Sequence, residues 1–428
     1  MAARSGTNDS PRSVVVVGAG IVGLSTAWFL QERGVKVTVV DREGVAAGAS
    51  WGNAGWISPA LTAPLNSPSV LREGLRSLAD PAAALHIPLR PDGALIRFLT
   101  RFAANCRASV WQEAVAANAV LNDEAIETYD VLVANGVDAP VTDTAIAVAF
   151  RDPQKATAFL GELNHMGTTN HEVHAEMLTG AALREQVPLA SPDIATVVNV
   201  SGQRFVDPGR FTQALGQAVA DRDGHIVTDD VVGFSGGDAV QVRLGSGETV
   251  RADAVVLAAG AWLPALTGRR VRVRLQAGRG YSFTVPVDRA LPGPIYLPEA
   301  RVACTPYRGG LRVAGTMEFR GPSEPLMPRR IEAIVAAAAP LLDGVRWAER
   351  RDLWVGPRPV TDDGKPLIGE LEPGVFTAGG HGMWGLAHGP ATGRLLAEQI
   401  TTGKQPEALR PFDPLRRGPR APEPSTGI

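Results

Sequence analysis

The sequence predicts an α/β protein that contains a strand–helix–strand unit with parallel strands, followed by hairpin-like and mostly extended segments. Three observations support this: a strand–helix–strand unit over residues 14–40, hairpin-like strands over residues 225–258, and a mostly extended segment over residues 271–320. The 428 residues are enough for two or three domains. Hydrophobic residues make up 45% and charged residues 20%, which is the composition of a folded globular protein.

The elements can be justified in chain order. Residues 14–17 form a β-branched run that suits a buried parallel strand, and apolar residues at helical spacing follow over residues 21–33. Gly34 stands where a helix C-cap is expected, and residues 36–40 predict the second strand. Residues 42–70 are rich in small residues and indicate a long loop, whereas apolar spacing predicts helix over residues 94–135.

The second half of the chain mixes both element types. Asp207 and Pro208 are a helix N-cap and a first-turn proline. Glycine turns then separate strand-like runs up to a buried strand at residues 254–258, and residues 329–342 predict a helix. Short strands flank a turn at Asp362, and Pro390 marks the start of a last helix.

Charge and cysteine content narrow the class of protein. Lys and Arg total 42 against 44 Asp and Glu, a formal charge of −2, so no broad basic surface for nucleic acid is expected. The two cysteines, Cys106 and Cys304, exclude a disulfide framework and argue against a thiolate metal site. We therefore expect no metal, no nucleic-acid partner and a reduced, cytoplasmic setting.

An uncharged stretch over residues 13–30 resembles a signal peptide or membrane helix only superficially. Its glycines would weaken a spanning helix, and the charged Glu32 and Arg33 lead directly into a second strand. We expect no transmembrane segment. Contact of the apolar residues 94–120 with the inner face of a membrane stays open, and a core face explains these residues equally well.

The first chemical signal is a glycine motif between the first strand and the first helix. Gly18 allows a tight turn, Gly20 lets the backbone approach a pyrophosphate, and Gly23 lets helix and strand pack closely. The helix N-terminus offers free N–H groups to phosphates, and Asp41 ends the next strand, where it can bind ribose hydroxyls. This context predicts a dinucleotide site, and the acid favours FAD or NAD over NADP.

Three further segments favour FAD. The run from Ala49 to Gly55 and the buried strand before Gly260 and Ala261 are rich in small residues, so a dinucleotide can lie close to the backbone. Residues 379–389 form a glycine-rich turn that a flat ring can approach, and the helix after it would favour the anion of a reduced flavin.

Taken together, these motifs resemble the FAD-dependent D-amino-acid oxidase superfamily, and within it the small-subunit type of D-amino-acid dehydrogenase. The resemblance covers residues 13–414 and includes VVVVGAGIVGLSTAWFL, ASWGNAGWISPALTAP, RGYSFTVP, LRVAGTMEF and TAGGHGMWGLAHGPATG. It implies a Rossmann-like FAD-binding domain, interleaved with an α+β substrate domain that carries an antiparallel sheet. It also implies oxidation of an amino acid at the Cα–N bond.

The resemblance implies domain limits and FAD contacts. The FAD-binding domain would comprise residues 1–60, 205–268 and 352–415, and the substrate domain residues 61–204 and 269–351; we expect residues 416–428 to be a disordered tail. Non-covalent FAD contacts are expected from Gly18, Ala19, Gly20, Ile21, Val22, Gly23, Asp41, Arg42, Ser50, Asn53, Ala54, Gly55, Val232, Gly260, Ala261, Gly382, Met383, Trp384 and Gly385.

Three residues are candidates for the substrate site. Arg358 matches an arginine that binds the substrate carboxylate in related glycine oxidases, although an ion pair with Asp362 or Asp363 is an alternative. Tyr281 would contact the substrate or close the pocket, unless it only packs. His381 would hydrogen-bond the flavin or support it indirectly. The relatives have a second arginine where this chain has Met383.

The predicted reaction is oxidative deamination of a D-amino acid to a 2-oxo acid and ammonia, by hydride transfer from Cα to flavin N5. Alternatives are an oxidase or dehydrogenase of D-proline, hydroxyproline, sarcosine or glycine, and a non-catalytic FAD-binding assembly factor. A tRNA-modifying flavoprotein is disfavoured by the charge of −2. The electron acceptor stays open between oxygen, a quinone and a partner protein.

Overall fold

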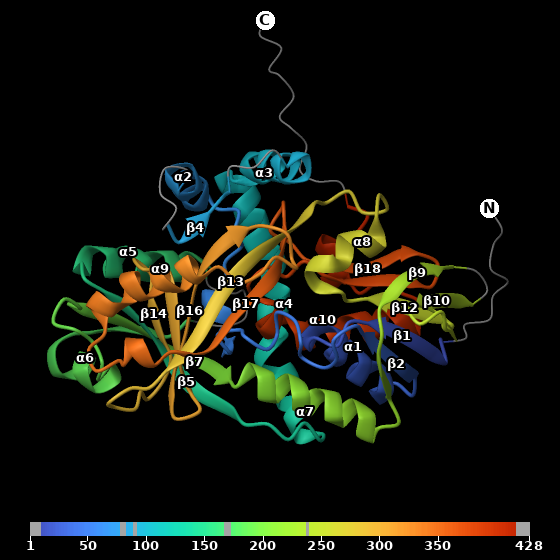
Figure 1. Ribbon diagram of the computed structural model, residues 1–428, viewed down its shortest axis with the longest axis horizontal. Coiled ribbons are helices and arrows are strands. Elements are labelled where there is room, and N and C mark those ends of the chain that lie inside the picture. Colours follow the sequence, from blue (N-terminus) through green and yellow to red (C-terminus); the bar gives the residue numbers. More distant parts are fainter. Residues whose placement is uncertain (1–9, 78–82, 89–91, 167–172, 237–238, 417–428) are drawn as a thin grey trace, which may run out of the picture.

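The computed structural model describes residues 10–77, 83–88, 92–166, 173–236 and 239–416. Two sheets lie side by side along the long axis, and the long helix α4 (Ala108–Ala134) passes between them (Figure 1). The smaller sheet contains the N-terminal strands, and the larger one contains most strands from the middle of the chain.

The smaller sheet is mostly parallel, in the order β18-β19-β12-β1-β2-β8, and only β18 runs antiparallel to its neighbour. Its strands are β1 (Ser13–Val17), β2 (Lys36–Asp41), β8 (His225–Thr228), β12 (Ala254–Leu257), β18 (Leu367–Glu372) and β19 (Val375–Gly379). Val14 and Val16 pack against helices, whereas Val15 and Val17 pack against a small second sheet. Because both faces of β1 are covered, its sequence is uniformly apolar rather than alternating.

The layers on either side of this sheet come from distant parts of the chain. Helices on one face are α1 (Ile21–Glu32), α7 (Pro208–Asp221) and α10 (Gly385–Thr402). Strands on the other face are β9 (Val231–Ser235), β10 (Val240–Leu244) and β11 (Thr249–Ala252). A Cβ atom at Gly393 would lie 2.6 Å from the backbone of Ser25, so α10 can approach α1 closely only with glycine there.

The larger sheet has ten strands, with the main order β17-β13-β16-β15-β14-β5-β7-β3. Its strands are β3 (Trp56–Ile57), β4 (Leu85–His86), β5 (Val141–Phe150), β6 (Ala175–Leu178), β7 (Thr196–Val206), β13 (Leu275–Val285), β14 (Ile295–Leu297), β15 (Val302–Tyr307), β16 (Gly310–Phe319) and β17 (Arg351–Thr361). The remaining helices are α2 (Pro68–Ser77), α3 (Gly93–Asn105), α5 (Pro153–Met166), α6 (Gly180–Gln186), α8 (Leu263–Thr267) and α9 (Pro328–Ala338). The apolar face of β13 and β16 packs on α9.

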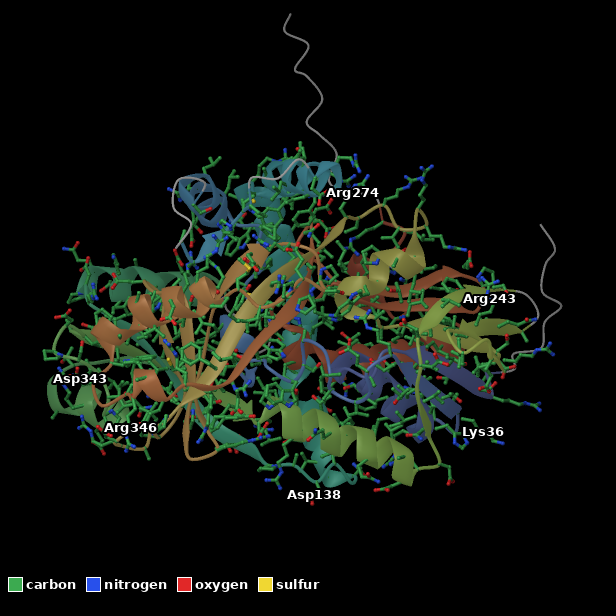
Figure 2. All side chains as sticks on the ribbon, in the orientation of Figure 1. Lys36, Asp138, Arg243, Arg274, Asp343 and Arg346 are labelled. Atoms are coloured by element: carbon green, nitrogen blue, oxygen red, sulfur yellow. The ribbon has the colours of Figure 1, made fainter. Side chains whose placement is uncertain are left out.

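Charged side chains of both signs project outward from both halves (Figure 2). Lys36 and Arg243 lie at the end that contains the smaller sheet, and Asp343 and Arg346 lie at the opposite end. Within the described part of the chain, no helix combines the length and apolar character needed to cross a membrane.

The predicted α/β class with a Rossmann-like parallel sheet is confirmed, and several element limits differ from expectation. The strands β3 and β17 belong to the larger sheet, although residues 56–57 and 352–361 were assigned to the nucleotide domain. The segment 94–135 contains two helices, which are separated at Cys106 and Arg107. The expected loop over residues 42–70 contains β3 and the start of α2.

The last helix also begins earlier than predicted, at Gly385 rather than Pro390. A proline inside a helix removes the N–H that would bond the carbonyl four residues earlier. Here the Leu386 carbonyl accepts a hydrogen bond from the Tyr129 hydroxyl, at 2.8 Å. Tyr129 on α4 thus replaces the missing donor, which is why Pro390 is tolerated within α10.

We expect Tyr129→Phe to destabilise the protein by about 1–3 kcal/mol, because a buried carbonyl loses its donor. Urea unfolding at a constant excess of FAD would measure the change. Pro390→Ala restores the backbone N–H, so the same tyrosine substitution should cost clearly less in that background. An equal cost in both backgrounds would contradict this role of Tyr129.

Candidate functional site

A cavity of about 520 Å³ extends from the carboxyl ends of β1, β2 and β12 to β17 and the start of α10. In parallel α/β sheets, ligands bind at this edge. Of the predicted site residues, those that line it are Gly18, Gly20, Ile21, Val22, Asp41, Arg42, Ser50, Asn53, Gly260, Ala261, Arg358, His381, Gly382, Met383 and Gly385. The structure thus brings together three segments that are distant in the sequence.

The glycine motif builds the central wall of this cavity. Gly18 has φ +115°, and a Cβ atom there would lie 2.5 Å from the Ala258 carbonyl oxygen. A Cβ atom at Gly23 would lie 2.0 Å from the Gly18 oxygen, so this glycine serves packing and is not in the lining. Gly20 is the N-cap of α1 without a side chain of its own, which leaves the helix N-terminus open towards the cavity.

Polar side chains shape the wall around this N-terminus. The Ser50 hydroxyl accepts from the Ile21 N–H at 3.0 Å. Asp41 accepts from the Ala19 N–H at 2.8 Å and from the Glu43 N–H at 2.9 Å, so its carboxylate is held at the end of β2. The Asp41 carboxylate and the N-terminus of α1 therefore lie next to each other, where the ribose and the phosphates of a dinucleotide would bind.

One end of the cavity lies beside Arg42, whose guanidinium carbon is 3.9 Å from the centroid of the Trp262 ring. Val231 belongs to the wall here. The predicted Val232 does not: its side chain is 64% exposed and lies outside the lining. The prediction for Val232 is a contact of its backbone with the adenine, which does not depend on the direction of the side chain, and it stays a prediction.

Other predicted residues support the wall without lining it. Gly55 has φ +88°, and a Cβ atom there would lie 2.3 Å from the Val206 oxygen. The Ala54 carbonyl accepts from Thr305 at 2.7 Å, and Trp384 Nε1 donates to the Ala63 carbonyl at 2.8 Å. These residues, with Ala19 and Gly23, hold the loops that border the cavity.

Arg358 lies at the other end of the cavity. Its Nη1 donates to the Thr316 carbonyl at 3.1 Å, and its guanidinium lies across Gly280, where a Cβ atom would be 2.0 Å from Cζ. Protein surrounds most of the Arg358 side chain, and the part that lines the cavity remains accessible. Burial lowers the pKa of Arg358 to about 10, so the side chain remains a cation at neutral pH.

In the described structure, Arg358 does not form the alternative ion pair with Asp362 or Asp363. Asp362 pairs with Arg101 at 2.6 Å, and Asp363 pairs with Arg416 at 2.9 Å. Arg358 is therefore a cation with hydrogen-bonding capacity directed into the cavity, without a carboxylate partner in the described chain.

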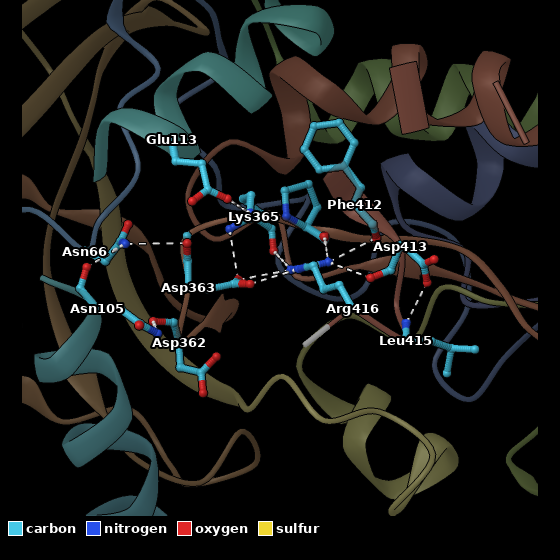
Figure 3. A network of polar contacts seen from close by, with 12 residues as sticks. Asn66, Asn105, Glu113, Asp362, Asp363, Lys365, Phe412, Asp413, Leu415 and Arg416 are labelled. Atoms are coloured by element: carbon cyan, nitrogen blue, oxygen red, sulfur yellow. Dashed lines mark hydrogen bonds and ion pairs between the residues drawn. The ribbon is translucent and has the colours of Figure 1, made fainter. Parts of the chain in front are cut away.

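Figure 3 shows the polar network that holds the turn after β17. Arg416 donates to both oxygens of Asp363, and Lys365 pairs with Glu113 of α4 at 2.7 Å. Asn105 at the end of α3 donates to the Asp362 carbonyl at 2.8 Å. The network anchors the strand that carries Arg358. It also shows Arg416, assigned to the tail, as part of the folded structure; residues 417–428 lie outside the described chain.

The expectation that Tyr281 faces the cavity is wrong. Its side chain is buried on the opposite face of β13, and its hydroxyl hydrogen-bonds Glu318. Glu318 also pairs with Arg279 at 3.4 Å and with Arg320 at 3.5 Å. Side chains alternate along a strand, and Gly280 is the residue of this pair that faces Arg358.

His381 does line the cavity, within a buried polar group behind the glycine-rich turn. Its Nε2 shares a hydrogen bond with Thr392 Oγ1 at 2.9 Å, and Nε2 of the nearby His388 shares one with Asn122 Oδ1 at 2.7 Å. Burial lowers the pKa of His381 to about 4 and that of His388 to about 3, with His381 adding to the effect at His388. Both rings are neutral at pH 7.

These lowered pKa values predict acid sensitivity. Unfolded histidine has a pKa near 6.5, so below that pH the unfolded state binds more protons, and stability falls as the pH drops from about 6.5 to 4. For His381 the loss approaches about 3 kcal/mol. We expect His381→Gln to flatten the melting temperature over this range, measured at a constant excess of FAD. His225→Gln, at an exposed histidine, should leave the profile unchanged; equal profiles for all three proteins would refute the prediction.

Several lining residues were not predicted from the sequence. Trp354 lies against Gly52 and Gly356, where Cβ atoms would collide with its ring at 2.0 and 1.8 Å. Ser323 and Glu324 reach the cavity from the loop after β16, and Trp262 Nε1 donates to Ser323 at 3.2 Å across the opening. Gly52 and Gly356, which leave room for the Trp354 ring, could have indicated its position from the sequence. Nothing in the sequence indicated the contact between Trp262 and Ser323.

Comparison with known proteins agrees with this geometry. The family model described as "FAD dependent oxidoreductase" (DAO) matches residues 13–399. The chain belongs to this family. It is a FAD-dependent amine or amino-acid oxidoreductase, acting on a CH–NH group, and FAD is its cofactor.

The relatives within the family differ in substrate. The chain is 30% identical to a D-amino acid dehydrogenase of Cereibacter sphaeroides and 29% identical to one of Methylobacterium radiotolerans; 92% of this chain is covered, and 92% and 96% of theirs. In structure it resembles glycine oxidase from Geobacillus kaustophilus, with a TM-score of 0.73 and 21% identity over 96% of this chain and 99% of that one. L-proline dehydrogenase from P. horikoshii gives a TM-score of 0.67 at 19% identity, over 95% and 98%.

The cavity fits the cofactor. A backbone wall without side chains at Gly18 and Gly20, the N-terminus of α1 in the lining and an acid at the end of β2 are the features that a dinucleotide site requires. Cys106 and Cys304 are buried and do not belong to the lining, so the described cavity presents no thiol for a covalent link.

Proposed function

We propose that the protein oxidises a D-amino acid to the imino acid, which water then hydrolyses to the 2-oxo acid and ammonia. The observation that carries the proposal is Arg358, a cation at the end of the cavity with no carboxylate partner in the described chain. A guanidinium binds a carboxylate through two parallel hydrogen bonds. The relatives named D-amino acid dehydrogenase favour an α-amino acid of D configuration.

The residues at this end of the cavity orient the substrate and exclude water. Arg358 binds the carboxylate, while Pro357, Pro359 and Met383 supply apolar wall around it. When bound, FAD supplies the acceptor for the two electrons and the hydrogen that leave Cα. Glu324, which also lines the cavity, pairs with Arg320 at 2.8 Å, so we assign it no role as a base. Orientation and desolvation then provide the main rate contribution.

The cofactor contacts are part of the proposal. The N-terminus of α1, with Gly20, Ile21 and Val22, would hold the pyrophosphate, and Asp41 and Arg42 would meet the ribose and adenine. The turn of Gly382, Met383 and Gly385 would border the flavin, and His381 would support that turn rather than exchange protons near pH 7.

Anaerobic titration of the FAD-loaded protein with D- and L-amino acids, glycine, sarcosine, hydroxyproline and D-proline tests the proposal. We expect D-amino acids to bleach the flavin absorbance and their L-enantiomers to leave it unchanged. If only glycine, sarcosine, hydroxyproline or D-proline bleaches the flavin, that compound is the substrate instead of a D-amino acid. Bound flavin that none of them reduces would indicate a non-catalytic binding protein.

The electron acceptor is identified by the same protein after reduction. Mixing the bleached protein with oxygen or with a soluble quinone should restore the absorbance at different rates. A dehydrogenase is reoxidised faster by quinone than by oxygen. The reverse order would classify the protein as an oxidase.

A further inference from the structure

A second buried arginine, Arg312 on β16, lies outside the cavity lining, and its hydrogen-bond donors are unused. Its side chain is 0% exposed, and its Nε, Nη1 and Nη2 find no acceptor among the described residues. Asp207 and Asp352 act on it electrostatically, but Asp207 is bound by Arg308 at 2.8 Å. A buried guanidinium without a hydrogen-bond acceptor lowers the stability of the folded protein. We therefore expect Arg312 to bind an acceptor that the described residues do not supply.

Two further unused donors lie on the same face of the sheet. Thr284 of β13 is directly opposite Arg312, and Tyr307 of β15 packs its ring 4.1 Å from the Arg312 Cζ atom. Both side chains are buried, and neither hydroxyl has a partner in the described structure. Three neighbouring strands therefore place two hydroxyls and a guanidinium without partners in the described structure next to one another on one face of the sheet.

The chemistry of this group selects the ligand. A guanidinium has only donors, and hydroxyls can donate, so the missing partner must be an acceptor, and a negative charge would offset the buried cation. The rings of Tyr307 and Trp51 lie 4.1 and 5.1 Å from Cζ. Rings stacked on the guanidinium leave its edge free for a planar, two-oxygen anion, which is the bidentate geometry of a carboxylate.

We propose that Arg312, Thr284 and Tyr307 form a buried subsite for a carboxylate group. Trp51 packs on Arg312, and its chain neighbours Ser50 and Gly52 line the main cavity, so the subsite lies beside that cavity. The carboxylate has two possible sources, a small free anion or the second carboxylate of a dicarboxylic substrate. Only the second source rests on the proposed function.

Thermal unfolding of the FAD-loaded protein in sodium acetate, with chloride keeping the ionic strength constant, tests the subsite without turnover. A ligand that binds only the folded state raises the melting temperature in a saturable way. We expect saturation in the wild-type protein and at least about tenfold weaker acetate binding in Arg312→Met. Arg346→Met removes an exposed arginine outside the subsite, one that pairs with Asp288 at 3.1 Å, and should retain the wild-type response.

Tyr307→Phe is the second variant, because it keeps the ring and removes only the hydroxyl. It should weaken acetate binding even if Arg312→Met fails to fold. The subsite is refuted if the wild-type protein shows no saturable rise, or if Tyr307→Phe and every folded Arg312 variant match it. Either result would mean that water or the surrounding dipoles satisfy Arg312.

Succinate and glutarate distinguish the two sources of the carboxylate. If a dicarboxylic substrate spans both arginines, these anions should bind more tightly than acetate, and Arg358→Met should abolish that advantage. If the ligand is a free anion, the dicarboxylates should show no advantage, and Arg358→Met should retain the acetate response. Failure of every amino acid to reduce the flavin would refute the proposed function but leave the acetate result intact.

Discussion

Replacing Arg358 with methionine should weaken binding of the substrate carboxylate by about 1.5–3 kcal/mol, or roughly 10- to 150-fold in Kd. The guanidinium has one protein acceptor, the Thr316 carbonyl, and otherwise faces the cavity. The substitution therefore removes the charge-assisted hydrogen bonds between the guanidinium and the substrate carboxylate. It breaks no salt bridge in the described structure. Anaerobic titration of flavin absorbance with the best substrate would measure the change.

Two variants separate binding geometry from charge and stability. Arg358→Lys keeps the cation but lacks the planar fork, so it should recover only part of the affinity. Arg346→Met, at an exposed residue of the opposite end, should bind substrate like the wild-type protein (Figure 2). Unchanged affinity in Arg358→Met would remove Arg358 from the substrate site.

Substituting Gly23 with alanine should abolish stable FAD retention and destabilise the fold by about 1–3 kcal/mol. The added Cβ atom would lie 2.0 Å from the Gly18 oxygen, a backbone atom that cannot rotate away. Relief requires α1 to move from β1, and that movement displaces Gly20 and the helix N-terminus from the cavity wall. FAD released on gel filtration and the free energy of unfolding would report the two effects.

Gly161→Ala is the matched control for this substitution. Gly161 lies within α5, and a Cβ atom there would have no atom of the described residues within 4 Å. Alanine has the higher helix propensity, so this variant should be as stable as the wild-type protein or slightly more stable, and it should retain FAD. Full FAD retention by Gly23→Ala would contradict the close-packing role of Gly23.

The strand–helix–strand unit and its nucleotide edge followed from local sequence alone. A β-branched run covered on both faces, glycines at the turn and an acid at the end of the next strand each require that residue type for a local physical reason. For this reason the limits of β1 and α1 agree with the prediction to within one residue, and Gly18, Gly20 and Asp41 line the cavity.

Only the tertiary structure decided which side chains meet at the far end of that cavity. Tyr281 and Gly280 are adjacent in sequence, and the pairing of β13 with β16 and β17 determines which of them faces Arg358. The placement of β17 in the larger sheet likewise depends on partners that lie far away in the chain. Strand register and long-range pairing set these contacts, so the sequence determined the nucleotide fold, and the assembled sheets determined the substrate end.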